Sequence, residues 1–293
     1  MKHHHVGSFL VARIGFGTMQ LPGPGVFGPP RDWEQALAVL RRAVQLGVDH
    51  IDTAQFYGPG VANELIREAL YPYPEKLALV SKVGNRRDDT GGWLPAQEPD
   101  QLRRDIEANL SALGTDQLAA VNLRVTDTEV DNPNQAGPLR REQFELQLKA
   151  MIKARDEGLI AGIGLSNIRL DHLLCAVEHT EIVCVQNAFN LVDRSSQSVL
   201  DECVARDIAF VPFFPLGSGF AADNPVLGNE TVQRTAARLG RTPAQIALAW
   251  TLSVARNVLL IPGTSSVEHL EQNLAVADIA LDEYTRRQLD DAV

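Results

Sequence analysis

Short apolar runs rich in β-branched residues alternate with segments of helical periodicity along almost the whole chain. Apolar residues recur at helical spacing within Trp33–Leu46, for example, and Gly47 ends that pattern. Thr242, followed by Pro243 and then Gln245, predicts a helix that starts with a capping box. This alternation favours a single (β/α)8 TIM barrel over a doubly wound sheet, and it continues without a composition shift, so one domain is expected over residues 1–293. The eight strand-like runs lie near Val11–Phe16, Val48–Asp52, Leu77–Lys82, Leu118–Arg124, Ile160–Leu165, Ile182–Gln186, Ile208–Phe213 and Val258–Ile261.

Composition excludes several classes of protein. The formal net charge of −10 argues against nucleic acid as a partner. No apolar run approaches the length of a bilayer span, and the first residues lack the apolar core of a signal peptide, so no membrane association is expected. Cys175, Cys184 and Cys203 lack C-x-x-C spacing and are expected to be reduced thiols of a cytoplasmic protein. His3–His5 alone make a poor metal site, so no metal is expected, and the oligomeric state is left open.

An Asp, a Tyr and a Lys lie at or just after the ends of two successive strand-like runs. Asp52 and Tyr57 share one segment, and Lys82 ends the next run. An ammonium near a phenol favours the phenolate because it stabilises the negative charge, and a carboxylate beside the lysine keeps the lysine protonated. Such a set suits proton transfer to or from a carbonyl oxygen. Each residue alone has a simpler interpretation, since a lysine at a strand end is usually a solvated charge.

Two long connecting segments follow strand-like runs, namely Arg86–Pro99 and Asp127–Pro138. Connections after the strands of a barrel lie over its C-terminal mouth, where long loops usually shape substrate binding. Disorder is the alternative interpretation of both segments.

Together these segments resemble the aldo-keto reductases, from Arg13–Thr18 to the end of the chain. The family's D-T-A-x-x-Y-G, S-K-x-G, G-x-S-N, Q-x-x-x-N and I-P-G-T-S-S-x-x-x-L-x-x-N patterns are matched, in this order, from Asp52, Ser81, Gly164, Gln186 and Ile261 onward. The resemblance implies a barrel enzyme that transfers a hydride between a nicotinamide cofactor and a carbonyl group. It implies that Tyr57 donates the proton and that Asp52 and Lys82 tune it.

The same resemblance implies the cofactor site. Ser166, Asn167 and Gln186 would bind the nicotinamide carboxamide, whose donors and acceptor they can match. Phe213 would stack on the nicotinamide ring. Taken singly, these residues have other interpretations: a helix cap for Ser166 and Asn167, and core packing for Phe213. The other implied cofactor-binding residues are Gly17, Thr18, Leu216, Gly217, Ser218, Gly219, Gly263, Thr264, Ser265, Ser266, His269, Gln272 and Asn273.

The adenosine end departs from the family pattern. Many relatives carry a Lys and an Arg that hold the 2′-phosphate of NADP, where this chain has Gly263 and His269. Thr264, Ser265 and Ser266 remain at an expected helix N-terminus, where hydroxyls, backbone donors and the helix dipole can bind a phosphate. NADPH/NADP+ is therefore the predicted cofactor, and NADH or dual use stays open. Simple helix capping is the alternative for Ser265 and Ser266.

A second departure concerns the strand near Leu118–Arg124. Ungapped alignment places Arg124 where many relatives have an active-site His. Asn122 and Arg124 lie two residues apart and share one face of the strand, which in a barrel can be the interior. A guanidinium cannot act as a general acid, but it can donate hydrogen bonds to a carbonyl oxygen. The alternative is an Arg124 turned outward into an ion pair.

The Arg variant and the segment Leu21–Pro30 resemble a bacterial subgroup of pyridoxal reductases. The predicted function is NADPH-dependent reduction of a small aldehyde or ketone, with a pyridoxal-like compound as one candidate. Two alternatives stay open: a cofactor-binding regulatory subunit with little turnover, and an alcohol-oxidising enzyme of secondary metabolism.

Overall fold

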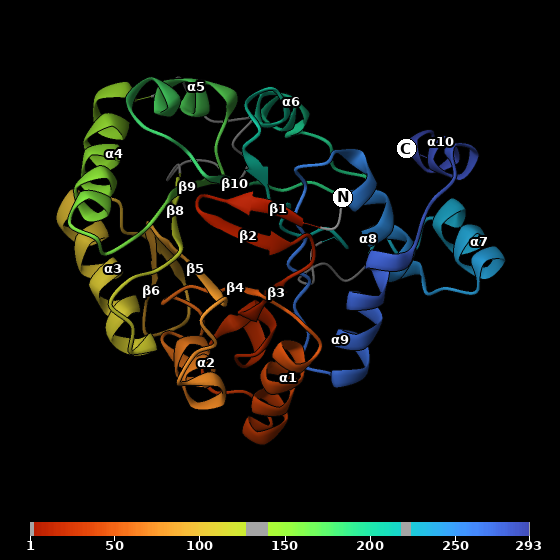
Figure 1. Ribbon diagram of the computed structural model, residues 1–293, viewed down its shortest axis with the longest axis horizontal. Coiled ribbons are helices and arrows are strands. Elements are labelled where there is room, and N and C mark those ends of the chain that lie inside the picture. Colours follow the sequence, from red (N-terminus) through yellow and green to blue (C-terminus); the bar gives the residue numbers. More distant parts are fainter. Residues whose placement is uncertain (1–2, 127–139, 218–223, 293) are drawn as a thin grey trace.

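A curled parallel sheet lies at the centre of the computed structural model, which describes residues 3–126, 140–217 and 224–292 (Figure 1). Seven strands pair in the order β11-β10-β9-β8-β5-β4-β3, so neighbours in the sheet follow one another along the chain. This order is the one expected of strands that are each followed by a crossover helix. The strands are β3 (Phe16–Gly17), β4 (His50–Asp52), β5 (Ala78–Val83), β8 (Ala120–Arg124), β9 (Ile163–Ser166), β10 (Cys184–Gln186) and β11 (Ala209–Phe210).

The two edges of this sheet are joined by the segment that was predicted as an eighth strand. Val258 forms a parallel bridge with Phe210, and Leu260 forms one with Ile14. The Gly15 amide donates to the Leu260 oxygen at 2.8 Å. Isolated bridges, rather than a regular strand, occupy this position, and the arrangement is consistent with a (β/α)8 barrel.

The first strand-like run is divided between two structures. β1 (His3–Val6) and β2 (Phe9–Ala12) form an antiparallel hairpin, whereas β3 begins only at Phe16. The prediction of one strand over Val11–Phe16 was therefore wrong at its start, because Val11 packs with Val6 onto the small interior residues of the sheet. The hairpin covers one end of the sheet, as Figure 1 shows.

Helices surround the sheet (Figure 1) and bury their apolar faces against its outer surface. The helix α8 begins as predicted, with Thr242 accepting a hydrogen bond from the Gln245 amide at 3.2 Å. α7 and α10 lie beside α8, outside the ring. The helices are α1 (Trp33–Gln45), α2 (Val61–Leu70), α3 (Pro99–Leu113), α4 (Arg141–Asp156), α5 (Leu170–His179), α6 (Gln197–Arg206), α7 (Glu230–Leu239), α8 (Pro243–Val254), α9 (Val267–Leu274) and α10 (Glu283–Asp290).

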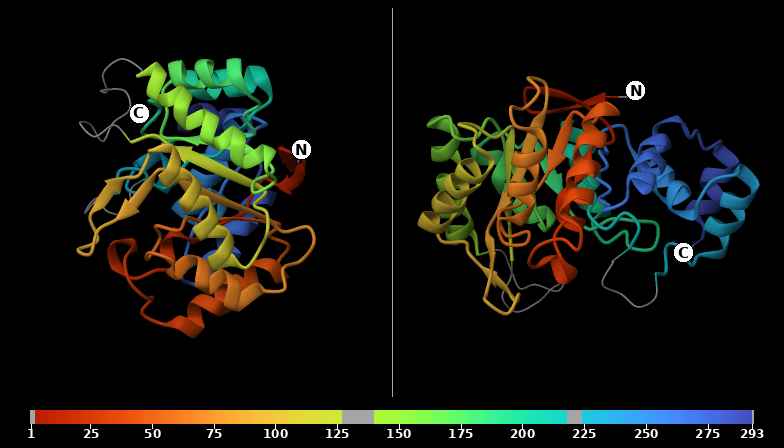
Figure 2. Two further views of the ribbon diagram at one scale, coloured as in Figure 1. Left: turned by 90° about the vertical axis from the view of Figure 1, so that its left-hand side faces the viewer. Right: turned by 90° about the horizontal axis from the view of Figure 1, so that it is seen from below.

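The C-terminal ends of the strands face away from the β1–β2 hairpin (Figure 2). A second hairpin, formed by β6 (Asn85–Arg87) and β7 (Trp93–Pro95), projects from that end and includes most of the long segment Arg86–Pro99. The other long segment, Asp127–Pro138, lies outside the described residues. The three cysteines are buried and free, as predicted. Within the described ranges, no helix combines the length and apolarity that crossing a bilayer requires.

Candidate active site

The ends of β4 and β5 bring a carboxylate, an ammonium and a phenol together. Lys82 Nζ donates to Asp52 Oδ1 and, at 3.2 Å, to the main-chain oxygen of Thr53. The same ammonium lies 5.1 Å from the centre of the Tyr57 ring. Asp52, Lys82 and Tyr57 expose only 3%, 5% and 6% of their surfaces. The structure therefore gathers the three residues that the sequence singled out.

Lys82 carries its charge in this buried setting. Burial by itself lowers the pKa of Lys82, but attraction to Asp52 and Tyr57 outweighs that effect and raises the pKa above its ordinary value. Lys82 is therefore an ammonium at neutral pH. Its fixed positive charge lies beside the ring of Tyr57 in a setting that is closed to solvent.

A buried polar network lies behind these strand ends, and the sequence analysis missed it. Thr18 Oγ1 donates to Thr53 Oγ1 at 3.0 Å, and Thr53 Oγ1 donates to Asn63 Oδ1 at 2.8 Å. Asn109 Oδ1 then accepts from Asn63 Nδ2 at 3.0 Å and from Ser81 Oγ at 2.6 Å. Thr53 and Ser81 are the residues next to Asp52 and Lys82 in their motifs. The signal available in the sequence was a polar residue, Thr53 or Ser81, directly next to Asp52 or Lys82, because neighbouring residues of a strand point to opposite faces.

Arg124 points toward the same side of the sheet as this site. Its Nη1 donates to Ser166 Oγ at 3.2 Å, and its guanidinium carbon lies 5.3 Å from the centre of the Phe213 ring. Burial lowers the pKa of Arg124, and the nearby Tyr57 opposes that shift. These contacts match the inward orientation expected from strand parity rather than the outward ion pair.

The residues predicted for the nicotinamide end follow β9 and β10. Gln186 Nε2 donates to Asp52 Oδ2 at 2.6 Å, so this amide contacts the same carboxylate as Lys82. Gln186 Oε1 is buried and has no hydrogen-bond partner among the described residues. A carboxamide NH2 would satisfy that acceptor, so this site fits a nicotinamide. Asn167 has a left-handed backbone (φ 56°), and its side-chain amide donates to the Val125 oxygen at 2.9 Å.

The segment after β11 provides the flat ring and part of the expected phosphate loop. Phe213 is half-buried and meets Phe214 edge to face at 5.3 Å. Asn224 Nδ2 donates to the Leu216 oxygen at 2.7 Å, and Gly217 adopts a positive φ of 82° that favours glycine. Ser218 and Gly219 lie outside the described residues.

At the adenosine end, two glycines allow a close backbone crossing. A Cβ on Gly263 would lie 2.4 Å from the Gly17 oxygen, and one on Gly17 would lie 2.5 Å from the Ile261 oxygen. Gly17 also pairs with Asp52 in the sheet register, so this crossing adjoins the strand that carries Asp52. The Lys that many relatives carry at this position therefore could not replace Gly263 directly, since any side chain there would require the neighbouring backbone at Gly17 to move.

The start of α9 carries the other predicted phosphate-binding groups. Ser266 caps the helix by accepting from the His269 amide at 3.3 Å, and Thr264 Oγ1 accepts from the Ser266 amide at 3.1 Å. Ser265 and His269 are exposed. Along the same helix, Gln272 Nε2 donates to Glu268 Oε1 at 3.2 Å, and the side chain of Asn273 is buried.

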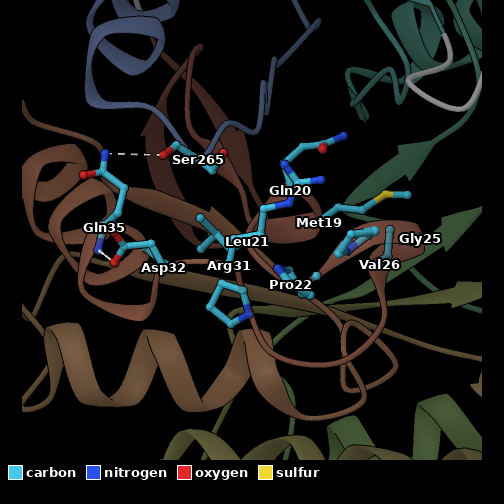
Figure 3. Close-up of a pocket in the computed structure, with 14 residues that line it drawn as sticks. Met19, Gln20, Leu21, Pro22, Gly25, Val26, Arg31, Asp32, Gln35 and Ser265 are labelled. Atoms are coloured by element: carbon cyan, nitrogen blue, oxygen red, sulfur yellow. Dashed lines mark hydrogen bonds between the residues drawn. The ribbon is translucent and has the colours of Figure 1, made fainter.

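A cavity of about 370 Å³ adjoins this helix start (Figure 3). Ser265 borders it from the α9 side, and Gln35 Nε2 donates to the Ser265 oxygen at 3.4 Å. Arg31 and Asp32 line it from the segment before α1, and the Asp32 carboxylate caps α1 through the Gln35 amide at 2.9 Å. Arg31 and Gln35 could not be identified from the sequence, because their proximity to Ser265 depends on the packing of α1 beside α9.

The fold and the residues gathered at the strand ends together fit one class of protein, the NADP-dependent oxidoreductases. Residues 13–293 match the aldo/keto reductase family, to which the chain therefore belongs. The predicted family and enzyme class are confirmed.

The chain is also similar to particular members of this family. The chain is 46% identical to pyridoxine 4-dehydrogenase of Escherichia coli (strain K12), over 97% of this chain and 96% of that protein. It resembles the crystal structure of a thermostable aldo-keto reductase in complex with the inhibitor epalrestat, with a TM-score of 0.82, 30% identity and complete coverage of both chains. It also resembles an aldo/keto reductase from Klebsiella pneumoniae in complex with NADP and acetate, with a TM-score of 0.79 and 26% identity, over 99% of this chain and 94% of that one.

Proposed function

We propose that this protein reduces a small aldehyde or ketone to an alcohol with NADPH. The observation that carries the proposal is the buried ammonium of Lys82, which lies between the carboxylate of Asp52 and the ring of Tyr57. NADPH, when bound, supplies a hydride from its nicotinamide ring. Tyr57 donates its proton to the carbonyl oxygen, and Lys82 stabilises the negative charge left on the phenol.

Arg124 is the second group proposed to act on the carbonyl oxygen. As the hydride arrives, negative charge develops on that oxygen, and a guanidinium donor stabilises it. Arg124 remains charged through this change, so Tyr57 is the residue that supplies the proton. An anionic group next to the carbonyl, such as the phenolate of pyridoxal, would also find a partner in Arg124.

Residues of the strand ends would hold the cofactor. We propose that Ser166, Asn167 and Gln186 bind the carboxamide and that Phe213 stacks on the ring, which fixes the face that meets the substrate. The unsatisfied Gln186 Oε1 supports this assignment. The start of α9, from Gly263 to His269, would receive the adenosine phosphate. The NADP complex of the Klebsiella pneumoniae relative supports NADP(H) over NAD(H).

The organisation of the chain belongs to the same proposal. We infer that the bridges at Val258 and Leu260 close the sheet into a (β/α)8 barrel and that residues 1–293 form one domain. The bridges of one segment to both sheet edges support the closure. A cytoplasmic location is also proposed, on the basis of the reduced cysteines.

The same residues can run the reaction toward oxidation. The similarity to a pyridoxine 4-dehydrogenase favours this second candidate, in which a pyridoxine-like alcohol is oxidised with NADP+. Tyr57 would then accept the proton that it donates in the reductive direction.

One assay separates these functions. Purified protein is mixed with NADPH or NADH and with pyridoxal, benzaldehyde or butanal, and the nicotinamide absorbance is followed. The reverse assay uses NADP+ with pyridoxine. We expect NADPH oxidation with at least one aldehyde and a lower rate with NADH. No turnover in either direction, with cofactor binding retained, would instead support a regulatory subunit.

A further inference from the structure

The base of the β6–β7 hairpin is hydrogen-bonded to the strand ends that carry the proposed catalytic groups. Its two strands pair antiparallel, with Arg87 opposite Trp93. The Ala96 amide, at its base, donates to the Gly84 oxygen at 2.9 Å, and Gln97 Nε2 donates to the Arg124 oxygen at 3.0 Å. The hairpin base is therefore fixed to the same strand end that carries Arg124.

Aromatic rings connect the hairpin to the proposed proton donor. Trp93 meets Phe56 edge to face with ring centres 5.7 Å apart, and Phe56 meets Tyr57 in the same way at 5.3 Å. Phe56 is 5% exposed and Tyr57 6%, whereas Trp93 is 43% exposed. A row of three rings thus runs from the catalytic phenol to an accessible indole.

Arg87 holds this indole in place. Its guanidinium carbon lies 4.0 Å from the centre of the Trp93 ring and 5.5 Å from that of Phe27. The guanidinium also donates to the oxygens of Val26 and Gly25 at 2.9 Å and to that of Gly91 at 2.6 Å. Because these bonds join the hairpin to the segment before α1, Arg87 fixes the position of the ring that it covers.

We propose that Trp93 contacts the substrate and selects planar aromatic carbonyl compounds, with Arg87 as its positioning residue. This inference rests on the proposed reductase function. A carbonyl oxygen held by Tyr57 and Arg124 leaves the rest of the substrate to extend toward the hairpin, which is attached beside both residues. An indole provides a flat apolar surface on which an aromatic ring stacks and an aliphatic chain does not.

Steady-state kinetics of Trp93→Ala test the contact with two neutral aldehydes, benzaldehyde and butanal. Loss of stacking should raise the KM for benzaldehyde about tenfold, because an aromatic pair contributes roughly that factor. The KM for butanal and both kcat values should change by less than about twofold. Trp93→Phe retains a ring and should recover most of the benzaldehyde KM.

Leu94→Ala is the matched control. Leu94 is the next residue on β7, is 39% exposed and pairs with Arg86, so its side chain lies on the other face of the hairpin. This variant should leave the KM for both aldehydes unchanged. An equal rise for benzaldehyde and butanal in Trp93→Ala, or no rise for either, would overturn the stacking role.

Arg87→Met tests the positioning role. It keeps an apolar stem but removes the guanidinium, so the KM for benzaldehyde should rise while kcat is retained. Acrylamide should quench the Trp93 fluorescence, taken as wild type minus Trp93→Phe, more strongly in this variant. Unchanged quenching and unchanged KM would remove Arg87 from the proposal.

A binding measurement separates this inference from the reductase function. Benzyl alcohol should protect Trp93 from acrylamide in the wild-type complex with NADP+, even if no aldehyde is turned over. Turnover without such protection would overturn the role of Trp93 and leave the reductase function intact. Protection without turnover would overturn the reductase function alone.

Discussion

The nicotinamide end and the adenosine end of the proposed cofactor site are built in different ways. At the nicotinamide end, Asp52 accepts hydrogen bonds from both Lys82 and Gln186, and all three side chains are buried. At the adenosine end, Ser266 bonds within its own helix turn, and His269 is exposed.

The difference indicates that the nicotinamide end serves proton transfer, whereas the adenosine end serves recognition of the cofactor. Charges buried against one another hold a single geometry, which proton transfer requires. The adenosine end offers a close backbone crossing, the exposed Ser265 and two hydroxyls that cap the start of α9. Substitutions there should therefore change the preference between NADPH and NADH more than the rate of the reaction. Among the residues proposed to contact cofactor or substrate, we expect substitutions at the nicotinamide end to have larger effects than substitutions at the adenosine end.

The largest effect is expected for Lys82→Met, at the nicotinamide end. Removing one partner of a buried pair leaves Asp52 uncompensated, which should cost about 3–5 kcal/mol of stability. Turnover should also fall by about 10²–10⁴-fold, because Tyr57 loses the charge that supports it. Urea unfolding and NADPH oxidation measure the two losses.

The double variant Lys82→Met with Asp52→Leu is the control for this prediction. Replacing both charges by apolar residues should restore much of the stability, since no unpaired charge remains. Activity should stay low. Recovered activity in the double variant would show that Lys82 and Asp52 are structural rather than catalytic.

A smaller effect is expected for Arg124→Ala, which removes one donor to the carbonyl oxygen. Loss of such a donor typically costs about 10²–10³-fold in kcat. Pyridoxal should lose more than a neutral aldehyde, because its phenolate also loses a partner. Arg124→His should recover part of the rate, since an imidazole can still donate one hydrogen bond. A change confined to KM would place Arg124 in substrate binding alone.

At the adenosine end, the two cations that many relatives carry should have opposite effects on NADPH affinity when they are introduced at positions 263 and 269. Gly263→Lys should lower stability by about 1–3 kcal/mol and weaken NADPH binding, because its Cβ would lie 2.4 Å from the Gly17 oxygen. His269→Arg places a cation at an exposed position of α9 and should tighten NADPH binding without affecting NADH. Fluorescence titration of both variants with both cofactors checks this. Tighter NADPH binding by Gly263→Lys would refute the close-crossing argument.

The smallest effect concerns the polar network behind the nicotinamide end. The main-chain oxygen of Asp105 accepts from Asn109, while burial raises the pKa of its carboxyl to about 6. The folded state thus binds this proton more tightly than the unfolded chain, whose Asp pKa is about 3.9. The stability that this proton provides is full below about pH 4 and is lost as the pH rises to about 6.

Asp105→Asn should consequently raise the unfolding free energy at pH 7 by about 1 kcal/mol, a figure reduced for partial solvent exposure. At pH 4 the variant and the wild type should be alike. Urea unfolding at both pH values measures the difference, and equal stability at pH 7 would show that solvent screens this carboxyl.

The features that could be predicted from the sequence are those that depend on short motifs at strand ends and on the regular alternation of strands and helices. The motif residues Asp52, Tyr57 and Lys82 could be predicted to meet, because each lies at or just after the C-terminal end of a strand at the same edge of the sheet. The regular alternation of elements likewise predicted the parallel order of the sheet. Strand parity allowed Arg124 to face the interior of a barrel, and its hydrogen bond to Ser166 agrees with that orientation.

Features that depend on packing between distant segments could not be predicted in this way. The N-terminal hairpin has the same β-branched composition as a barrel strand, so Val11 was assigned to the wrong element. Asn63 and Asn109 lie on separate helices. Asn63 accepts from Thr53, Asn109 accepts from Ser81, and the two asparagines bond to each other, so the network forms only where the helices pack together. The long segment Arg86–Pro99 was expected over the mouth, but its hairpin and the contacts of Trp93 required the structure.

Single-turnover kinetics of Tyr57→Phe test the central claim most directly. Protein saturated with NADPH is mixed with benzaldehyde, and the loss of nicotinamide absorbance is followed in wild type and variant. NADPH affinity should be unchanged, since the substitution removes one hydroxyl, while the rate should fall by about 10²–10⁴-fold. A rate within about twofold of wild type would contradict the assignment of Tyr57 as proton donor.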